Sequence, residues 1–158
     1  PGTHEVNAGA RLLAHCLERM KNRRGVRATA LDRWPADAPL LDRIASVVFL
    51  GDVFPPLRLP DSPRILADLE RMMQRGCGMS CLHFATGLQA RDLPPNGDHP
   101  LLRWLGGYFS TGDAPHHKSV ARVFPAVTIT PAAPKHPISR GWKTFTQDEE
   151  PYYNNYFG

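Results

Sequence analysis

Two short apolar runs separated by an amphipathic stretch limit the folds open to this chain more than any other feature. The first run, residues 47–50, is too short for a helix and ends at Gly51. It predicts a strand over residues 45–50 that is buried on both faces. The second run, residues 79–84, is also strand-like. If it is buried in the same way, truncating Leu82 to alanine should cost about 2–5 kcal/mol of stability.

The stretch between the two runs has the pattern of a helix. Ser62 and Pro63 supply an N-cap and a first-turn proline, and Gly76 supplies the stop. The apolar stripe between them consists of Ile65, Leu66, Leu69, Met72 and Met73. A strand, a crossover helix and a second strand form a βαβ unit, which needs parallel pairing and a right-handed connection. We therefore expect parallel strands whose carboxyl ends meet at one edge of a sheet.

The rest of the chain predicts further short elements joined by proline-rich loops. An amphipathic helix is expected over residues 6–20, a short strand over residues 26–31 and a capped helix over Pro100–Leu105. Residues 120–130 are expected to be extended. The prolines that follow, up to Trp142, exclude regular structure there. Too few residues lie on either side of these loops for them to be linkers between domains.

Length and composition narrow the class of protein. The 158 residues suit a single domain, and no run of about 18 apolar residues could cross a membrane. The net charge is only +4 and the basic residues are scattered, which argues against nucleic acid as a partner. Three cysteines, an odd number, argue against a disulfide framework. The chain begins at Pro1 without a signal-peptide pattern, so a cytoplasmic or a periplasmic location is left open.

The residues that directly follow the two predicted strands are the first candidates for a functional site. Ligands of open parallel sheets bind outside the carboxyl ends of the strands. Asp52 follows the first strand and His83 closes the second. An imidazole at this position can act as an acid, a base or an electrophile near neutral pH. The alternatives are a histidine that fixes the shape of a loop and an aspartate of ordinary turn chemistry.

An acidic and aromatic run near the C-terminal end is a second candidate. Asp148, Glu149 and Glu150 precede Tyr152 and further tyrosines and asparagines. Carboxylates accept hydrogen bonds from hydroxyl groups and aromatic rings cover the apolar faces of sugars, so the run fits a carbohydrate ligand. A solvated acidic turn beside a packed tyrosine-rich edge is the alternative. His4 and Glu5, just ahead of the first helix, are weaker candidates for the same crevice.

Other clusters carry weaker signals. His116 and His117 are adjacent and diverge on a helix or a strand, so we expect no metal site there. Cys81 lies two residues before His83, and a cysteine with a nearby histidine is a known nucleophilic pair. A cysteine inside a strand more often packs as a small hydrophobic residue. No glycine-rich phosphate loop is present, and we expect no cofactor.

Several stretches together resemble the ThuA-like (trehalose utilisation) family of the class I glutamine-amidotransferase-like superfamily. They occur in the family's order and cover nearly the whole chain. The family has an acidic pair, which corresponds in this sequence either to Glu149 and Glu150 or to Asp148 and Glu149. The stretches are residues 4–9, 47–51, 75–83, 102–109, 136–141 and 148–157.

The resemblance implies an α/β fold of the flavodoxin-like kind: a doubly wound, mainly parallel sheet with helices on both faces. Residues 1–158 would form one partial ThuA-like domain that lacks its first strand and its C-terminal end. The resemblance places a pocket at His83, as the catalytic residue, and adds Trp104 and Tyr108 to the substrate-binding set. It also implies that the amidotransferase cysteine nucleophile is absent.

The function implied is the binding or processing of a small carbohydrate in disaccharide or keto-sugar catabolism, alongside a sugar oxidoreductase of the same pathway. His83 would be the acid–base or electrophilic group. Glu149, Glu150 and Tyr152 would orient hydroxyl groups, while His4 and Glu5 would close the rim. A cysteine-dependent hydrolase that uses Cys81 and a non-catalytic interaction module remain the alternatives.

Overall fold

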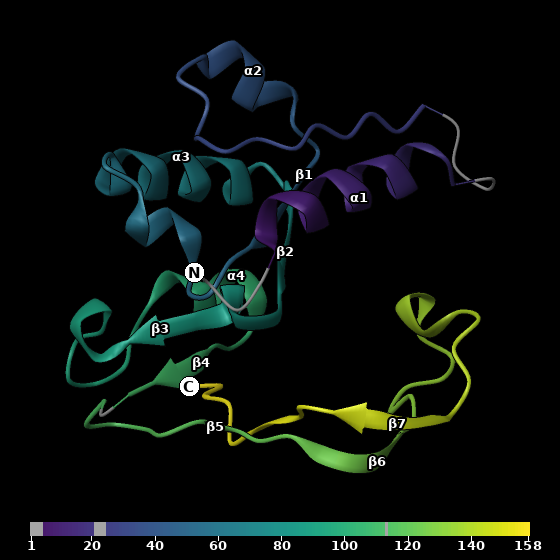
Figure 1. The fold of residues 1–158 in the computed structure, drawn as a ribbon. Helices are drawn as coiled ribbons and strands as arrows, with labels where there is room; N and C mark the ends of the chain where they lie inside the picture. Colours follow the sequence, from purple (N-terminus) through teal and green to yellow (C-terminus); the bar gives the residue numbers. More distant parts are fainter. Residues whose placement is uncertain (1–4, 21–24, 113) are drawn as a thin grey trace.

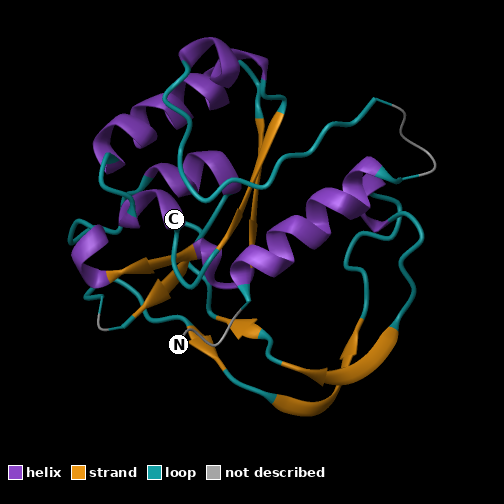
Figure 2. Cartoon of the chain, turned by 45° about the horizontal axis from the view of Figure 1, so that its top comes forward, coloured by secondary structure: helices purple, strands orange, loops and turns teal. Residues whose placement is uncertain are grey.

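The computed structural model describes residues 5–20, 25–112 and 114–158. The helices α1, α2 and α3 lie around a pair of strands, β1 and β2, and the C-terminal third of the chain forms an extended arm below them (Figure 1). Colouring by secondary structure shows the strands as separate pairs (Figure 2). The chain therefore joins one helix-covered unit to a strand-rich extension.

The helix-covered unit is built on the βαβ pattern of the sequence. β1 (Ser46–Leu50) pairs parallel with β2 (Gly78–Leu82), in a register that aligns Leu50 with Leu82. Helix α3 (Ser62–Gln74) connects them and starts with a proline in its first turn. The predicted parallel pairing, with both carboxyl ends at one edge, is confirmed.

The expected doubly wound sheet is wrong. Every sheet in the described residues has only two strands, and the pairs mix parallel and antiparallel directions. After β2 the chain turns into a 3₁₀ helix instead of a second strand–helix unit, so no further long strand adds to the pair. Besides β1 and β2, the pairs are β3 (Gly87–Gln89) with β4 (Phe109–Thr111), β5 (Val120–Ala121) with β8 (Tyr152–Tyr153), and β6 (Phe124–Ile129) with β7 (Phe145–Glu149).

The expected burial of the first strand on both faces is also wrong. Val47 and Phe49 pack against the core, but Val48 is 39% exposed and Leu82 is 41% exposed. Neighbouring side chains of a strand point to opposite faces, so one face of the pair covers the core and the other, with α1 against β1, is partly exposed. The strand expected over residues 26–31 is absent, because no second strand lies beside this exposed segment in the part of the chain described.

The helices follow their sequence signals. The first helix, α1 (Val6–Glu18), forms as predicted, and α4 (Pro100–Leu105) is capped by His99 and ends at Gly106, whose φ of 84° suits a glycine. A short helix that the sequence pattern did not predict, α2 (Ala38–Arg43), is capped by the Asp37 carboxylate. The 3₁₀ helices are η1 (Pro55–Arg58), η2 (His83–Thr86), η3 (Ala90–Asp92) and η4 (Pro137–Ser139).

The core lies where α3, α4 and the covered face of β1 and β2 meet. Its least exposed apolar side chains are Phe54, Ile65, Leu69, Leu88 and Leu101. At its edge, Arg58 donates two hydrogen bonds to the Asp92 carboxylate and so ties η1 to η3. None of the helices in the described part of the chain has the length and apolar character needed to cross a membrane.

Candidate functional site

His83 stands at the point where β2 ends and the chain turns into η2. Its φ of 56° lies in the left-handed region, which few residues other than glycine adopt. Such backbone strain costs on the order of 1–3 kcal/mol and tends to persist at functional sites. The Thr86 hydroxyl donates to the His83 carbonyl at 3.2 Å and helps to hold the turn. The chain leaves the strand direction at His83, whose side chain is 46% exposed.

His83 is reached by Glu150, which directly follows β7, and by Tyr152, the first residue of β8. In an extended chain, residues two apart point to the same side, and Pro151 between them keeps Glu150 extended. The Tyr152 hydroxyl lies 3.1 Å from His83 Nδ1. Glu150 Oε2 lies 3.5 Å from His83 Nε2, within the range of an ion pair. The structure therefore brings together three of the residues that the sequence singled out.

The neighbouring Glu149 has a different role. Its carboxylate accepts one hydrogen bond from the Glu150 backbone N–H and another from the Gln147 side-chain amide. These bonds, the backbone one first, lower the pKa of Glu149, and the charge of His83 acts in the same direction. Both oxygens already have donors, so Glu150 is the acid that makes direct contact with His83.

Aromatic rings hold Tyr152 in place. Its ring centroid lies 5.0 Å from that of Phe84 and 4.9 Å from that of Phe109. The His83 ring meets the Tyr152 ring edge-on at 5.5 Å. Burial, followed by the charge of Glu150, raises the pKa of Tyr152, so its hydroxyl stays protonated at neutral pH. The tyrosine is therefore a positioned hydrogen-bond donor.

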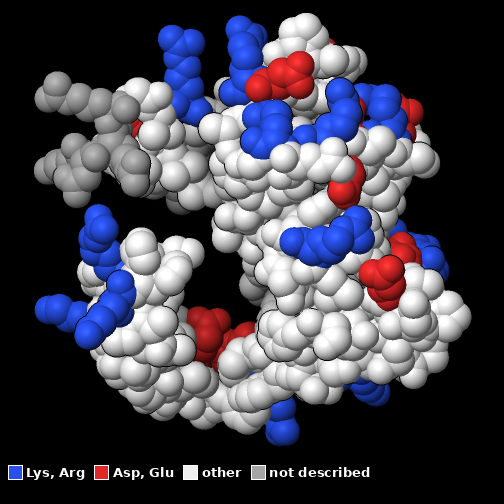
Figure 3. Space-filling model, turned by 180° about the vertical axis from the view of Figure 1, so that it is seen from behind, with Lys and Arg blue, Asp and Glu red and all other residues white. Residues whose placement is uncertain are grey.

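The surface of the molecule is hollowed between the β6–β7 arm and the rest of the chain. Acidic side chains lie at the base of this hollow, and basic side chains project from the arm (Figure 3). Comparison with protein-family models, with curated proteins and with solved structures finds no match to this chain. The resemblance to the ThuA-like family therefore stays a prediction, and the site is described from its own geometry.

Two of the remaining predicted site residues, Trp104 and Tyr108, lie elsewhere. Trp104 donates its indole N–H to Glu70 at 3.2 Å, and Tyr108 is buried with its hydroxyl donating to the Gly97 carbonyl. Neither belongs to the cluster around His83. Glu5 precedes α1 and Asp52 follows β1, and both side chains are exposed. His4 lies outside the described residues.

The paired histidines hold structural hydrogen bonds. His116 Nε2 lies 2.8 Å from the Tyr108 hydroxyl, and the His117 ring bonds the Asn154 carbonyl. Within the ranges that the structure describes, no three His, Cys, Asp or Glu side chains gather as a set of metal ligands.

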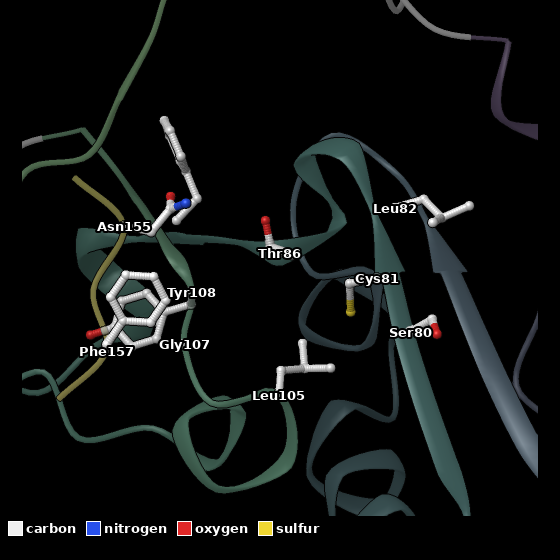
Figure 4. Close-up of a pocket in the computed structure, with 10 residues that line it drawn as sticks. Ser80, Cys81, Leu82, Thr86, Leu105, Gly107, Tyr108, Asn155 and Phe157 are labelled. Atoms are coloured by element: carbon white, nitrogen blue, oxygen red, sulfur yellow. The ribbon is translucent and has the colours of Figure 1, made fainter. Parts of the chain in front are cut away.

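A cavity of about 420 Å³ lies beside the His83 turn, and Tyr108, one of the predicted substrate-binding residues, lines it. The Cys81 sulfur points into it, between Leu105 on one side and Thr86 on the other (Figure 4). Asn155 and Phe157 close it from the C-terminal segment. Its walls come from segments far apart in the sequence, so no local pattern could signal it. His83 and Glu150 do not line it.

Cys81 should be unreactive toward iodoacetamide at neutral pH. Burial raises the pKa of its thiol to about 12, so the nucleophilic thiolate is scarce. The exposed Cys16 serves as a control in the same molecule. Peptide mass spectrometry should show alkylation of Cys81 at least about tenfold slower than that of Cys16. Equal rates would revive the cysteine-hydrolase alternative.

Proposed function

We propose that this chain is a carbohydrate-binding domain whose site is formed by His83, Glu150 and Tyr152. The observation that carries the proposal is the meeting of His83 and Tyr152 across 69 residues of sequence, with Glu150 beside them. The cluster combines a carboxylate, an imidazole and a phenol at a partly exposed position. This is the set of groups with which proteins bind hydroxyl-rich ligands.

We also propose that the ligand is a small sugar of disaccharide or keto-sugar catabolism, as the resemblance to the ThuA-like family implies. A sugar oxidoreductase of the same pathway would supply it. The paired strands of the chain do not match the sheet that the resemblance implies, so the support for this sugar class lies in the motifs and in the site. Glu150 would accept hydrogen bonds from sugar hydroxyls, and the rings of Tyr152 and Phe84 would cover an apolar sugar face.

The test is a calorimetric titration with trehalose, sucrose, methyl glucoside and their 3-keto derivatives. We expect at least one of these sugars to bind, and Glu150→Gln to weaken its binding about tenfold, because the substitution keeps the shape and removes the charge that strengthens hydrogen bonds. Glu149→Gln is the matched control. It should change the affinity less than about twofold, since the Glu149 carboxylate is held by the backbone and by Gln147.

His83→Asn completes this experiment. Asparagine tolerates the left-handed φ at this position better than alanine does, so the fold should be retained. We expect binding to fall at least about tenfold with little change in the melting temperature. If the variant melts far below the parent and still binds sugar when folded, His83 is a structural histidine. If the parent binds none of the sugars, the interaction-module alternative is favoured.

A further inference from the structure

Both ring nitrogens of His83 have polar neighbours, and these neighbours favour one position for its proton. The Glu150 carboxylate lies 3.5 Å from Nε2 and can only accept a hydrogen bond, so it favours the neutral tautomer that carries its hydrogen on Nε2. Nδ1 then offers its lone pair to the Tyr152 hydroxyl at 3.1 Å. Tyr152 is the donor of that bond, consistent with a hydroxyl whose pKa is raised. Carboxylate, imidazole and hydroxyl thus follow one another in a line.

We propose that Glu150, His83 and Tyr152 form a proton relay, in which the Tyr152 oxygen meets a hydroxyl group of the ligand and His83 acts as the base behind it. This proposal rests on the proposed function and assigns a separate role to each of the three residues. Tyr152 is the catalytic residue, because it touches the ligand. Within the relay Glu150 acts through the imidazole, which it orients and stabilises as the imidazolium, in addition to the hydrogen bonds that it would accept from the sugar.

The proton balance of the relay is simple. The ligand O–H bond breaks and its proton moves to the Tyr152 oxygen, while the original Tyr152 proton moves to His83 Nδ1. The ligand oxygen becomes negative and the imidazole becomes positive. The charge of Glu150, and that of Glu149 at longer range, stabilises the positive ring. Run in reverse, the same path returns a proton to the negatively charged ligand oxygen.

The chain carries a built-in control for this relay in Tyr153. Tyr152 and Tyr153 are neighbours on β8 and therefore point to opposite faces. Tyr153 is 46% exposed and meets the Phe124 ring at 5.9 Å, away from His83. Burial and the charge of Glu150 raise the pKa of Tyr152, so its nucleophilic phenolate is scarce without a base. Rapid reaction of Tyr152 therefore requires assistance from His83.

The test uses 4-nitrophenyl acetate, a small acyl donor that needs no knowledge of the ligand. The Tyr152 oxygen attacks the ester carbonyl, its proton passes to His83 Nδ1, and 4-nitrophenolate leaves. Peptide mass spectrometry then compares acetylation of Tyr152 with that of Tyr153. We expect Tyr152 to react at least about tenfold faster, within the range that general-base assistance supplies.

Variants distinguish acetylation that His83 assists from acetylation that depends only on how exposed each tyrosine is. His83→Asn should lower the acetylation of Tyr152 about tenfold or more and leave that of Tyr153 unchanged. Glu150→Gln should lower it several-fold, and nitrogen–proton NMR should show that His83 loses its preference for the Nε2–H tautomer. Tyr153→Phe should leave the acetylation of Tyr152 unchanged.

The relay is overturned if Tyr152 reacts no faster than Tyr153, or if fast acetylation survives His83→Asn. These results are independent of the sugar titration. Sugar binding without rapid acetylation leaves a binding site without a relay. Rapid acetylation without sugar binding leaves an activated tyrosine that acts on another class of hydroxyl ligand.

Discussion

Leu69→Ala should lower the free energy of unfolding by about 2–5 kcal/mol, whereas Leu82→Ala should lower it by about 1 kcal/mol. Leu69 is fully buried in the core between α3 and its neighbours, so its truncation leaves a cavity that the surroundings fill only in part. Leu82 is 41% exposed at the end of β2. The sequence alone, if its second apolar run were fully buried, would instead give Leu82→Ala a loss of about 2–5 kcal/mol.

Urea unfolding of the two variants and the parent measures this difference, because the substitution is the same at both positions. Equal m-values would show that the compactness of the unfolded state has not changed. A loss at Leu82 as large as that at Leu69 would mean that the partly exposed face of β1 and β2 is covered in solution. It would contradict the exposure described above.

Stability should fall as the pH drops from about 6.5 to about 4, by as much as about 3 kcal/mol, because His99 is buried in its neutral form. Burial lowers the pKa of His99 to about 4, against the opposing charges of Asp92 and Asp98. Its Nδ1 accepts the Leu101 N–H at the start of α4 and cannot do so when protonated. Below pH 6.5 the unfolded chain binds a proton that the folded chain does not, so acidification favours unfolding.

Denaturant titrations of the parent and of His99→Asn at several pH values test this expectation. Asparagine is a good N-cap and has no titrating group, so the variant should show a flatter dependence between pH 6.5 and 4. The test compares how steeply the free energy of unfolding changes with pH, so it holds even if the variant is less stable overall. Carboxylates also titrate in this range, and the comparison removes their shared contribution. Parallel curves would show that His99 does not titrate differently in the two states.

The elements that the sequence predicts well are those specified by local patterns. Helix α3 has its proline, its apolar stripe and its stop within one segment, and β1 and β2 are dense apolar runs. Local sequence patterns fail to predict a strand where its formation depends on pairing with a distant segment. The strand expected over residues 26–31 has no partner strand in the described part of the chain, while β3 and β4 are strands only because they meet each other.

The residue types of the candidate site can likewise be predicted from the sequence, but their arrangement cannot. The chemistry of His83, Glu150 and Tyr152 is visible in the sequence, because strand ends and acidic–aromatic runs are recognisable locally. The choice of Glu150 over Glu149 depends on how the backbone after β7 turns one carboxylate inward. The cavity beside Cys81 depends on a C-terminal segment that returns across the molecule, and no pattern at Cys81 announces it.

The long separation between His83 and Tyr152 has a consequence for the order of events during folding. The connection between β6 and β7 is 15 residues long, so their pairing closes a far shorter loop than the contact between His83 and Tyr152, which spans 69 residues. A species that holds only the β1–β2 unit, or only the β6–β7 hairpin, lacks one half of the site. The hydrogen bond between imidazole and phenol thus serves as a natural reporter of complete folding, because it forms only after both halves of the chain have docked.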